Sequence, residues 1–148
     1  MSYHNKNYIQ CQGNIFQVCQ ITHEGNVSSV RDAGGNLIER RKLAYIEPVP
    51  ITTELLDSLG FKKGKNSPTL QMLTDSYAYG IFQKEDGTFR LIIMNIGQLQ
   101  MEVMELIRVL ASIMGRTFFD VKFIHQIQNL FEAIEGIPLV FNDKNEKA

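Results

Sequence analysis

The sequence lacks any apolar run long enough to cross a membrane. No stretch of about 18 consecutive apolar residues occurs in it. The opening segment, Met1-Ser2-Tyr3-His4-Asn5-Lys6-Asn7, is polar and has none of the apolar centre of a signal peptide. These absences predict a protein that does not enter a membrane and that works in the cytoplasm.

Cysteine is scarce, and its placement argues against a disulfide. The two cysteines are Cys11 and Cys19, and Gly13-Asn14 between them is typical of a tight hairpin turn. A two-residue loop at that position pairs Cys11 with Phe16, which sends the Cys19 side chain to the opposite face of the strands. We therefore expect two free thiols and no redox role.

Motifs for catalysis or metal binding are also missing. The sequence has three histidines, His4, His23 and His125, and none has a second His or Cys at metal-ligand spacing. It contains no Gly-x-Ser-x-Gly and no phosphate-binding loop. Gly34-Gly35 lies between two expected strands, which predicts a turn. We expect no enzyme activity, no metal and no cofactor.

The chain has no excess of either charge. It carries 15 Lys and Arg against 16 Asp and Glu, a net charge of −1. That balance disfavours general affinity for nucleic acid or anionic membrane. Two basic clusters with nearby aromatics nevertheless permit binding of single-stranded nucleic acid, and the alternative is ordinary solvated charge. The clusters consist of Arg40, Arg41 and Lys42, near Tyr45, and of Lys62, Lys63 and Lys65, near Phe61.

What is present indicates an α+β fold. With 148 residues and 44% hydrophobic residues, the chain can bury a core without metals or disulfides. Short apolar runs separated by Gly/Asn turns predict a small bent β-sheet or SH3-like barrel in residues 1–47. The expected strands are Tyr8 to Gln12, Ile15 to Thr22, Val27 to Asp32 and Leu37 to Ile46.

Residues 48–148 are expected to form an α+β subdomain that packs with the first. Pro48 and Pro50 end the β-rich part, and Thr52 is placed to cap a short helix that stops at Gly60. A β-hairpin region and two longer helices follow. The expected elements are strands at Leu70 to Leu73, Tyr77 to Gln83, Thr88 to Met94 and Thr117 to Val121, helices at Gln100 to Met114 and Phe123 to Glu135, and an edge strand at Ile137 to Phe141.

The first of the longer helices has a wide apolar surface. In residues 101–114 the polar positions occupy one narrow arc, and the apolar arc spans about 220° at 100° per residue. That is about twice what one core-facing stripe requires. A homodimer through this helix is therefore expected, and the alternative is a helix covered on both sides within one chain. Residues 97–104 also alternate apolar and polar, so the start of this segment fits either strand or helix.

The last helix carries a polar stripe opposite its apolar positions. Phe123, Ile127, Leu130 and Ile134 are expected to face the core. The stripe on the other side consists of His125, Gln128, Asn129 and Glu132. Its side chains can donate and accept hydrogen bonds. Two interpretations stay open: a surface that binds a partner or acts as a weak acid–base site, or a structural stripe that fixes neighbouring backbone.

This helix also carries a resemblance. Phe123-Ile124-His125-Gln126-Ile127-Gln128-Asn129-Leu130-Phe131, followed by Ala133-Ile134-Glu135-Gly136, resembles the closing signature of small uncharacterised proteins of phages and mobile elements of gut bacteria. Pro48 to Leu56 with Leu59-Gly60-Phe61, and Tyr8-Ile9-Gln10 with Gly13-Asn14, are similar to two further segments of that group. The resemblance implies a phage or mobile-element origin and a bacterial host cell.

Together these features predict a non-enzymatic accessory protein that acts through contacts with an unknown protein partner. The alternative is a nucleic-acid-binding module that uses the N-terminal β-barrel and the basic clusters.

Overall fold

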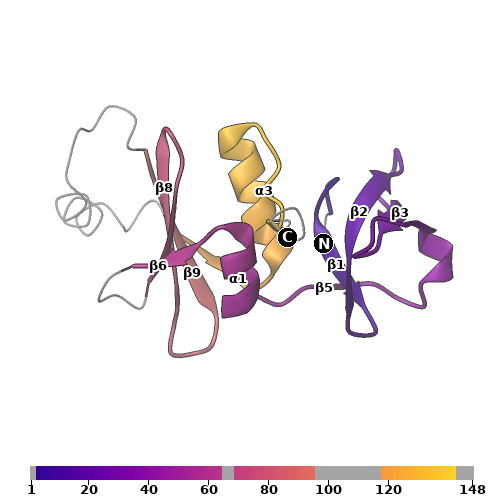
Figure 1. The fold of residues 1–148 in the computed structure, drawn as a ribbon, viewed down its shortest axis with the longest axis horizontal. Coiled ribbons are helices and arrows are strands. Elements are labelled where there is room, and N and C mark those ends of the chain that lie inside the picture. Colours follow the sequence, from indigo (N-terminus) through magenta and orange to yellow (C-terminus); the bar gives the residue numbers. More distant parts are fainter. Residues whose placement is uncertain (1–2, 65–68, 96–117, 143–148) are drawn as a thin grey trace. The chain divides into compact units, whose positions relative to one another are not determined.

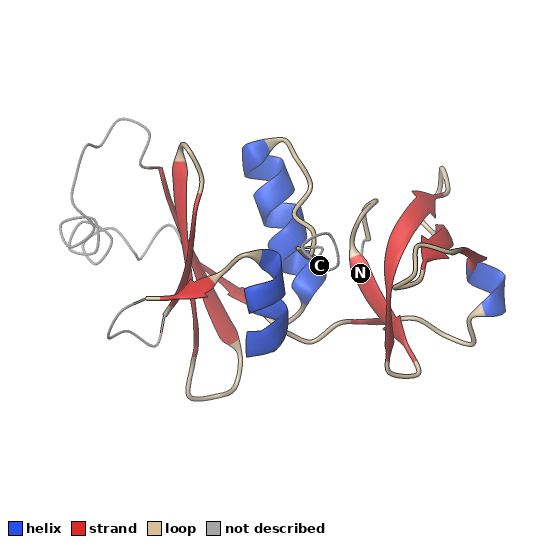
Figure 2. Cartoon of the chain, viewed as in Figure 1, coloured by secondary structure: helices blue, strands red, loops and turns tan. Residues whose placement is uncertain are grey.

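The computed structural model describes residues 3–64, 69–95 and 118–142, with Asn95 described by its backbone alone. The chain is a mixed α+β protein with two antiparallel sheets (Figures 1 and 2). Its elements are β1 (Tyr8–Cys11), β2 (Asn14–Ile21), β3 (Val27–Arg31), β4 (Leu37–Glu39), η1 (Arg40–Lys42), β5 (Glu47–Pro48), α1 (Thr53–Leu59), β6 (Lys62–Lys63), β7 (Leu70–Leu73), β8 (Tyr77–Gln83), β9 (Phe89–Asn95), β10 (Phe118–Val121) and α3 (Ile124–Glu135).

The chain divides into two compact units, and the division differs from the predicted boundary at residue 47. Unit 1 contains residues 1–55 and 123–148, and unit 2 contains residues 56–122. The last helix therefore belongs with the N-terminal sheet. The sequence pattern did not predict that the last helix joins the N-terminal unit, because the contacts that hold it there link residues more than 70 positions apart. The Ile124 amide donates to the Val49 carbonyl at 2.9 Å, and Pro50 forms an isolated bridge with Phe123.

Unit 1 contains an open five-stranded sheet in the order β4-β3-β2-β1-β5. Its core consists of Ile9, Val18, Val27 and Val30, with partly buried side chains, including Tyr3 and Phe16, packed against it. The strand expected to run from Leu37 to Ile46 ends at Glu39, because a 3-10 turn follows it. The segment expected as an edge strand at Ile137 to Phe141 is not a strand.

The first hairpin turns one residue earlier than the sequence suggested. Cys11 pairs with Asn14, so the loop is Gln12-Gly13, with φ angles of 51° and 81°. Positive φ at both central residues defines a type I′ turn, which matches the twist of the strands it joins. Both thiols, Cys11 and Cys19, are free, as predicted.

Unit 2 contains the second sheet, in the order β10-β9-β8-β7-β6. The predicted hairpin forms from β8 and β9, in register from Tyr77–Asn95 to Gln83–Phe89. Successive residues of β9, Leu91 to Met94, are all buried, so both faces of this central strand are covered.

Local signals predicted both described helices. The Thr52 hydroxyl accepts a hydrogen bond from the Leu55 amide at 3.2 Å, and Gly60 follows α1 with a φ of 107°. Gly136 ends α3 with a φ of 78°.

The helix expected at 100–114, the ambiguity at 97–104 and the dimer contact through 101–114 lie outside the described residues. No described helix is long and apolar enough to span a membrane.

Candidate functional site

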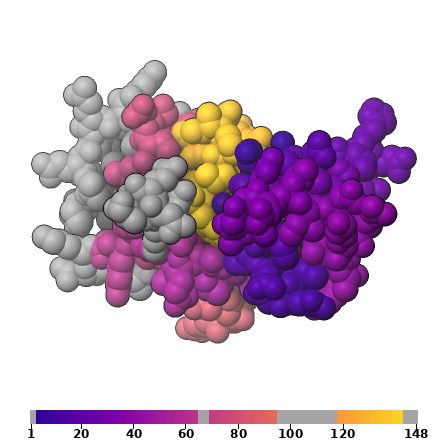
Figure 3. Space-filling view, turned by 45° about the vertical axis from the view of Figure 1, so that its right-hand side comes forward, coloured from indigo at the N-terminus to yellow at the C-terminus, as the bar shows by residue number. Residues whose placement is uncertain are grey.

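The polar residues of α3 lie against the N-terminal segment of unit 1. Figure 3 shows α3 in yellow beside the N-terminal residues in indigo. Two members of the polar stripe are almost completely buried: His125 is 3% exposed and Gln128 is 2% exposed. Asn129 and Glu132 are half-buried. The stripe is therefore for the most part an internal contact, which agrees with the interpretation that it fixes neighbouring backbone.

Gln128 bonds to three backbone groups in two separate segments of the chain. Its Oε1 accepts a hydrogen bond from the Tyr8 amide at 2.9 Å. Its Nε2 donates to the Lys6 carbonyl at 2.9 Å and to the Leu139 carbonyl at 2.8 Å. Both amide hydrogens and the carbonyl oxygen of the side chain are thus used. One buried side chain fastens the start of β1 and the segment after α3 to the helix, and we call this arrangement the Gln128 clamp.

Asn129 adds a second attachment to the same N-terminal segment. Its Oδ1 accepts a hydrogen bond from Asn7 Nδ2 at 2.9 Å. Asn7 is 1% exposed, and its own Oδ1 accepts from the His4 amide at 2.7 Å. The Asn7 carbonyl accepts from the Val18 amide at 2.8 Å, so this residue also ties the turn to β2. Because the buried Asn7 side chain and backbone are both hydrogen-bonded, they hold the N-terminal segment in one backbone conformation.

The segment after α3 is held on the other side of Tyr8. The Tyr8 and Phe141 rings stack with their centroids 3.7 Å apart and their planes 8° from parallel. The Tyr8 hydroxyl accepts a hydrogen bond from the Phe141 amide at 2.8 Å. Burial raises the pKa of the Tyr8 hydroxyl, and the hydrogen bond from Phe141 opposes part of that rise. Tyr8 therefore stays a neutral anchor at physiological pH.

His125 is the one buried titratable group of this cluster that stays unsatisfied. Its ring lies between Tyr3, at 4.9 Å between centroids, and Phe123, at 6.0 Å. Within the described residues its buried Nδ1 has no hydrogen-bond partner. Burial lowers the pKa of His125, and the positive charges of His4 and the amino terminus lower it further. The imidazole is therefore neutral at pH 7.

Backbone strain marks the turn that the clamp holds. Lys6 has a φ of 75°, a left-handed conformation that costs an L-residue about 1–2 kcal/mol. Its amide donates to the Val18 carbonyl at 2.9 Å, while its side chain is exposed. The hydrogen bonds of the Lys6 backbone thus hold an unfavourable conformation in place.

Replacing Lys6 by glycine is expected to stabilise the protein. Glycine adopts positive φ without steric cost, so Lys6→Gly should raise the free energy of unfolding by up to about 1 kcal/mol after its greater chain entropy is counted. Thermal denaturation followed by circular dichroism measures the change. Lys6→Ala is the control, since it removes the same side chain but keeps the strain. Equal midpoints for the two variants would contradict the prediction.

The basic clusters engage neighbouring groups within their own units. Arg40 Nη1 donates to the Leu43 carbonyl at 2.9 Å, and Arg41 forms an ion pair with Glu39. On β6, Lys62 pairs with Asp57 at 2.9 Å. Lys63 is exposed, and Lys65 lies outside the described residues. One cluster belongs to unit 1 and the other to unit 2.

Neither compact unit carries a large positive charge. Unit 1 carries seven Lys and Arg against nine Asp and Glu, and unit 2 carries eight against seven. Their formal charges are therefore −2 and +1. Proteins that bind nucleic acid through its phosphates usually carry a clear positive excess.

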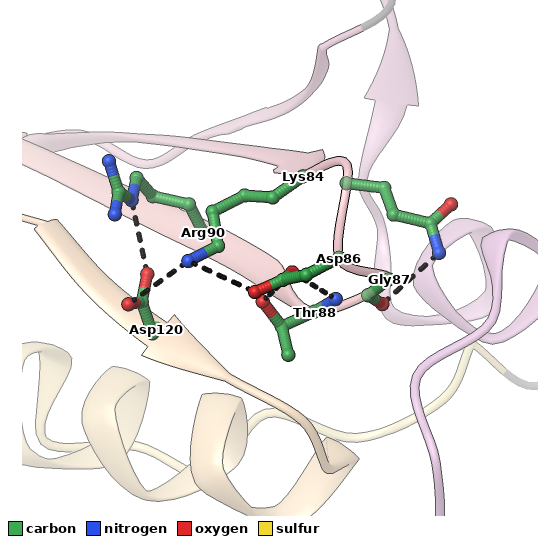
Figure 4. A network of polar contacts seen from close by, with 7 residues as sticks. Lys84, Asp86, Gly87, Thr88, Arg90 and Asp120 are labelled. Atoms are coloured by element: carbon green, nitrogen blue, oxygen red, sulfur yellow. Dashed lines mark hydrogen bonds and ion pairs between the residues drawn. The ribbon is translucent and has the colours of Figure 1, made fainter.

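A polar network that the sequence did not reveal fastens β10 in unit 2 (Figure 4). Arg90 and Asp120 are direct cross-strand partners, with Arg90 Nε 3.0 Å from Asp120 Oδ1. Lys84 Nζ lies 3.3 Å from the other carboxylate oxygen, and the Arg90 guanidinium lies 4.0 Å from the centre of the Phe118 ring. The hydrogen bond from Arg90 is the main cause that lowers the pKa of Asp120. Because these charges satisfy one another, the network is structural.

One surface depression of about 380 Å³ lies in unit 1, between the first hairpin and the turn after β3. Its only carboxylate belongs to Asp32, whose Oδ1 accepts from the Gly34 and Asn36 amides, each at 2.9 Å. Hydrogen bonds from Asn36 lower the pKa of that carboxyl group. Asp32 therefore shapes its own turn, and within the described residues no group of three His, Cys, Asp or Glu is placed to hold a metal.

Comparison of the chain with protein-family models, curated proteins and solved structures gave no match.

Proposed function

We propose that the chain is a non-enzymatic accessory protein of a phage or mobile element that acts through protein–protein contacts. The observation that carries this proposal is the Gln128 clamp. His125, Gln128 and Asn129 are the residues of the stripe best suited to chemistry, and the fold uses two of them to hold its own N-terminal segment, Gln128 through backbone groups and Asn129 through the Asn7 side chain. The resemblance of this helix to proteins of phages and mobile elements supports the origin, and the bacterial cytoplasm is the location proposed with it.

The clamp also prepares a surface for a partner. Leu139 is 7% exposed and anchors the segment after α3, while Ile137 at 59% and Val140 at 37% project outward. The hydrogen bonds of Leu139 and Phe141 fix the backbone on both sides of Val140. A partner that binds them does not have to order a flexible segment, and this preorganisation favours affinity. We call Ile137 and Val140 the apolar pair.

The test compares capture of host proteins by tagged variants of the full chain. The double variant Ile137→Ser with Val140→Ser is expected to lose a specific partner that the parent retains, with its melting temperature unchanged because both side chains are exposed. Leu37→Ser is the matched control, since Leu37 is 57% exposed in the same unit. Equal capture by the double variant would refute this surface, and the absence of any partner specific to the parent would refute the function.

Self-association through residues 101–114 stays part of the proposal, and it rests on the apolar arc of the sequence. Light scattering coupled to size-exclusion chromatography over a dilution series tests it. A mass that remains monomeric at high micromolar concentration would rule the dimer out.

The second candidate is a nucleic-acid-binding module based on an SH3-like barrel. Its support is the topology of unit 1: the fifth strand returns beside the first, a 3-10 turn precedes it, and register shifts after Val18 bend β2. Tyr45, 44% exposed, follows the cluster Arg40–Lys42. The pairing of Arg41 and the net charge of each unit weigh against it. Fluorescence anisotropy with single-stranded RNA and DNA across a salt series decides, because binding through phosphates must weaken as salt rises.

A further inference from the structure

Tyr3 lies against His125 in unit 1, and the exposed His4 follows it. The Tyr3 ring contacts the imidazole and also packs against the core of the sheet. His4 is joined to Asn7 by two hydrogen bonds, from its amide to Asn7 Oδ1 at 2.7 Å and from the Asn7 amide to its carbonyl at 3.1 Å. These contacts make Tyr3 and His4 a short cover, which we call the N-terminal cover.

Lys6, Asn7 and Tyr8, which follow the N-terminal cover, make more hydrogen bonds to the rest of unit 1 than the cover does. The Lys6 backbone bonds to Val18 and Gln128, Asn7 bonds to Asn129, and the Tyr8 amide bonds to Gln128. The cover can therefore move only about the turn at Asn5-Lys6, where Lys6 already has a strained φ of 75°. Opening there would break the two hydrogen bonds between His4 and Asn7 and would expose His125 to water without unfolding β1.

Protonation changes the balance between the closed and open cover. A neutral imidazole tolerates an unpaired nitrogen, whereas an imidazolium has an N–H donor at both nitrogens and a charge to solvate. In the closed arrangement Nδ1 meets no partner among the described residues. The rings of Tyr3 and Phe123 attract a cation only weakly compared with that desolvation.

The neighbouring charges act in the same direction. Among the described residues, the ionisable groups that act on His125 or its cover are Tyr3, His4 and Glu47 on β5, which acts on Tyr3. Burial and Glu47 raise the pKa of Tyr3, which stays neutral. The positive charges repel an imidazolium. The pKa of His125 in the closed state lies below the ordinary 6.5. Opening of the N-terminal cover therefore becomes more favourable as the pH falls below 6.5.

We propose that His125 is a proton-sensitive latch, and that its protonation releases Tyr3 and His4 from unit 1 while the Gln128 clamp keeps the rest of the fold closed. Mildly acidic conditions thereby uncover part of the α3 surface and the adjoining sheet core. This property does not depend on the proposed protein partner.

The absence of tryptophan from the chain allows a clean reporter. In the full-length variant Tyr3→Trp, lowering the pH from about 7.5 to about 5, the range in which histidine changes charge, is expected to shift emission to longer wavelength and to increase quenching by acrylamide. Far-UV circular dichroism should stay constant. In Tyr3→Trp with His125→Phe, which keeps a ring but takes up no proton, emission should not change with pH. His4→Gln in the reporter background should retain the transition.

Three results would overturn the latch. These are an emission that does not depend on pH, a pH response that persists with His125→Phe, and a loss of circular dichroism over the same range, which would indicate unfolding of the whole unit. Nuclear Overhauser effects between the Tyr3 and His125 rings of the unmodified chain provide a second measurement. They should be present at about pH 7.5 and lost at about pH 5, and their persistence would contradict the proposal even if the tryptophan variant did not fold.

Discussion

Gln128→Met is expected to lower the free energy of unfolding by about 2 kcal/mol or more, because it removes the side-chain partner of the Tyr8 amide and of the Leu139 carbonyl, at about 1–3 kcal/mol each. Methionine has a similar length but no amide, so the Tyr8 amide and the carbonyls of Lys6 and Leu139 lose their hydrogen bonds to Gln128, and the Lys6 carbonyl keeps its bond from Gln17. For a protein of ordinary stability this is a large fraction of the total free energy of unfolding. Urea denaturation followed by circular dichroism measures the change.

The matched control is Gln17→Met. Gln17 Nε2 donates to the same Lys6 carbonyl at 3.2 Å, but in a solvent-exposed position. Water can replace that bond, so the control should cost less than about 1 kcal/mol. Similar losses in the two variants would show that the Gln128 clamp contributes nothing specific.

Gln128→Glu tests the same clamp through its pH dependence. A carboxylate can still accept from Tyr8, but it faces the carbonyls of Lys6 and Leu139 and has nothing to donate to them. Burial and these acceptors should raise the pKa of the new carboxyl group in the folded state. The folded variant then binds more protons than the unfolded chain, so its stability should rise as the pH falls. Gln128→Met should lack that rise, and an equal pH dependence in both variants would contradict the argument.

Ile127→Ala is expected to cost about 2–5 kcal/mol, the usual range for a buried aliphatic side chain. Ile127 is 1% exposed, and its neighbours on the buried face, Ile124 and Phe131, are 0% and 6% exposed. Truncation leaves a cavity, and the closely packed side chains around it cannot move far enough to fill it. Thermal and urea denaturation of the full chain measure the loss.

Leu130→Ala is the control on the same helix, and it is expected to cost less than Ile127→Ala. Leu130 is half-buried, as are Phe123 and Ile134, which the helical wheel also assigned to the core. A partly exposed leucine loses less transfer free energy when it is truncated. If the two variants lost equal stability, the assignment of the buried face would be wrong.

The difference in burial between Ile127 and Leu130 shows where the helical wheel assigned the buried face incorrectly. A wheel that separates apolar from polar residues places His125 and Gln128 opposite the core face, and it does not decide whether they bind a partner or fix neighbouring backbone. In the fold α3 has two buried sides: one packs its isoleucines and Phe131, and the other meets the N-terminal segment and the segment after the helix. A polar residue enters such an interface when backbone groups are there to satisfy it.

What the sequence determined by itself is local. The hairpins, the short helix capped by Thr52 and the end of α3 at Gly136 follow from residues within a few positions of one another, since turn and cap geometry depend on adjacent dihedral angles. The tertiary structure alone decided that β5 pairs with β1, that α3 returns to the first unit and that His125 is buried. Burial and long-range pairing depend on a second surface from elsewhere in the chain, and no single segment specifies which surface will cover it.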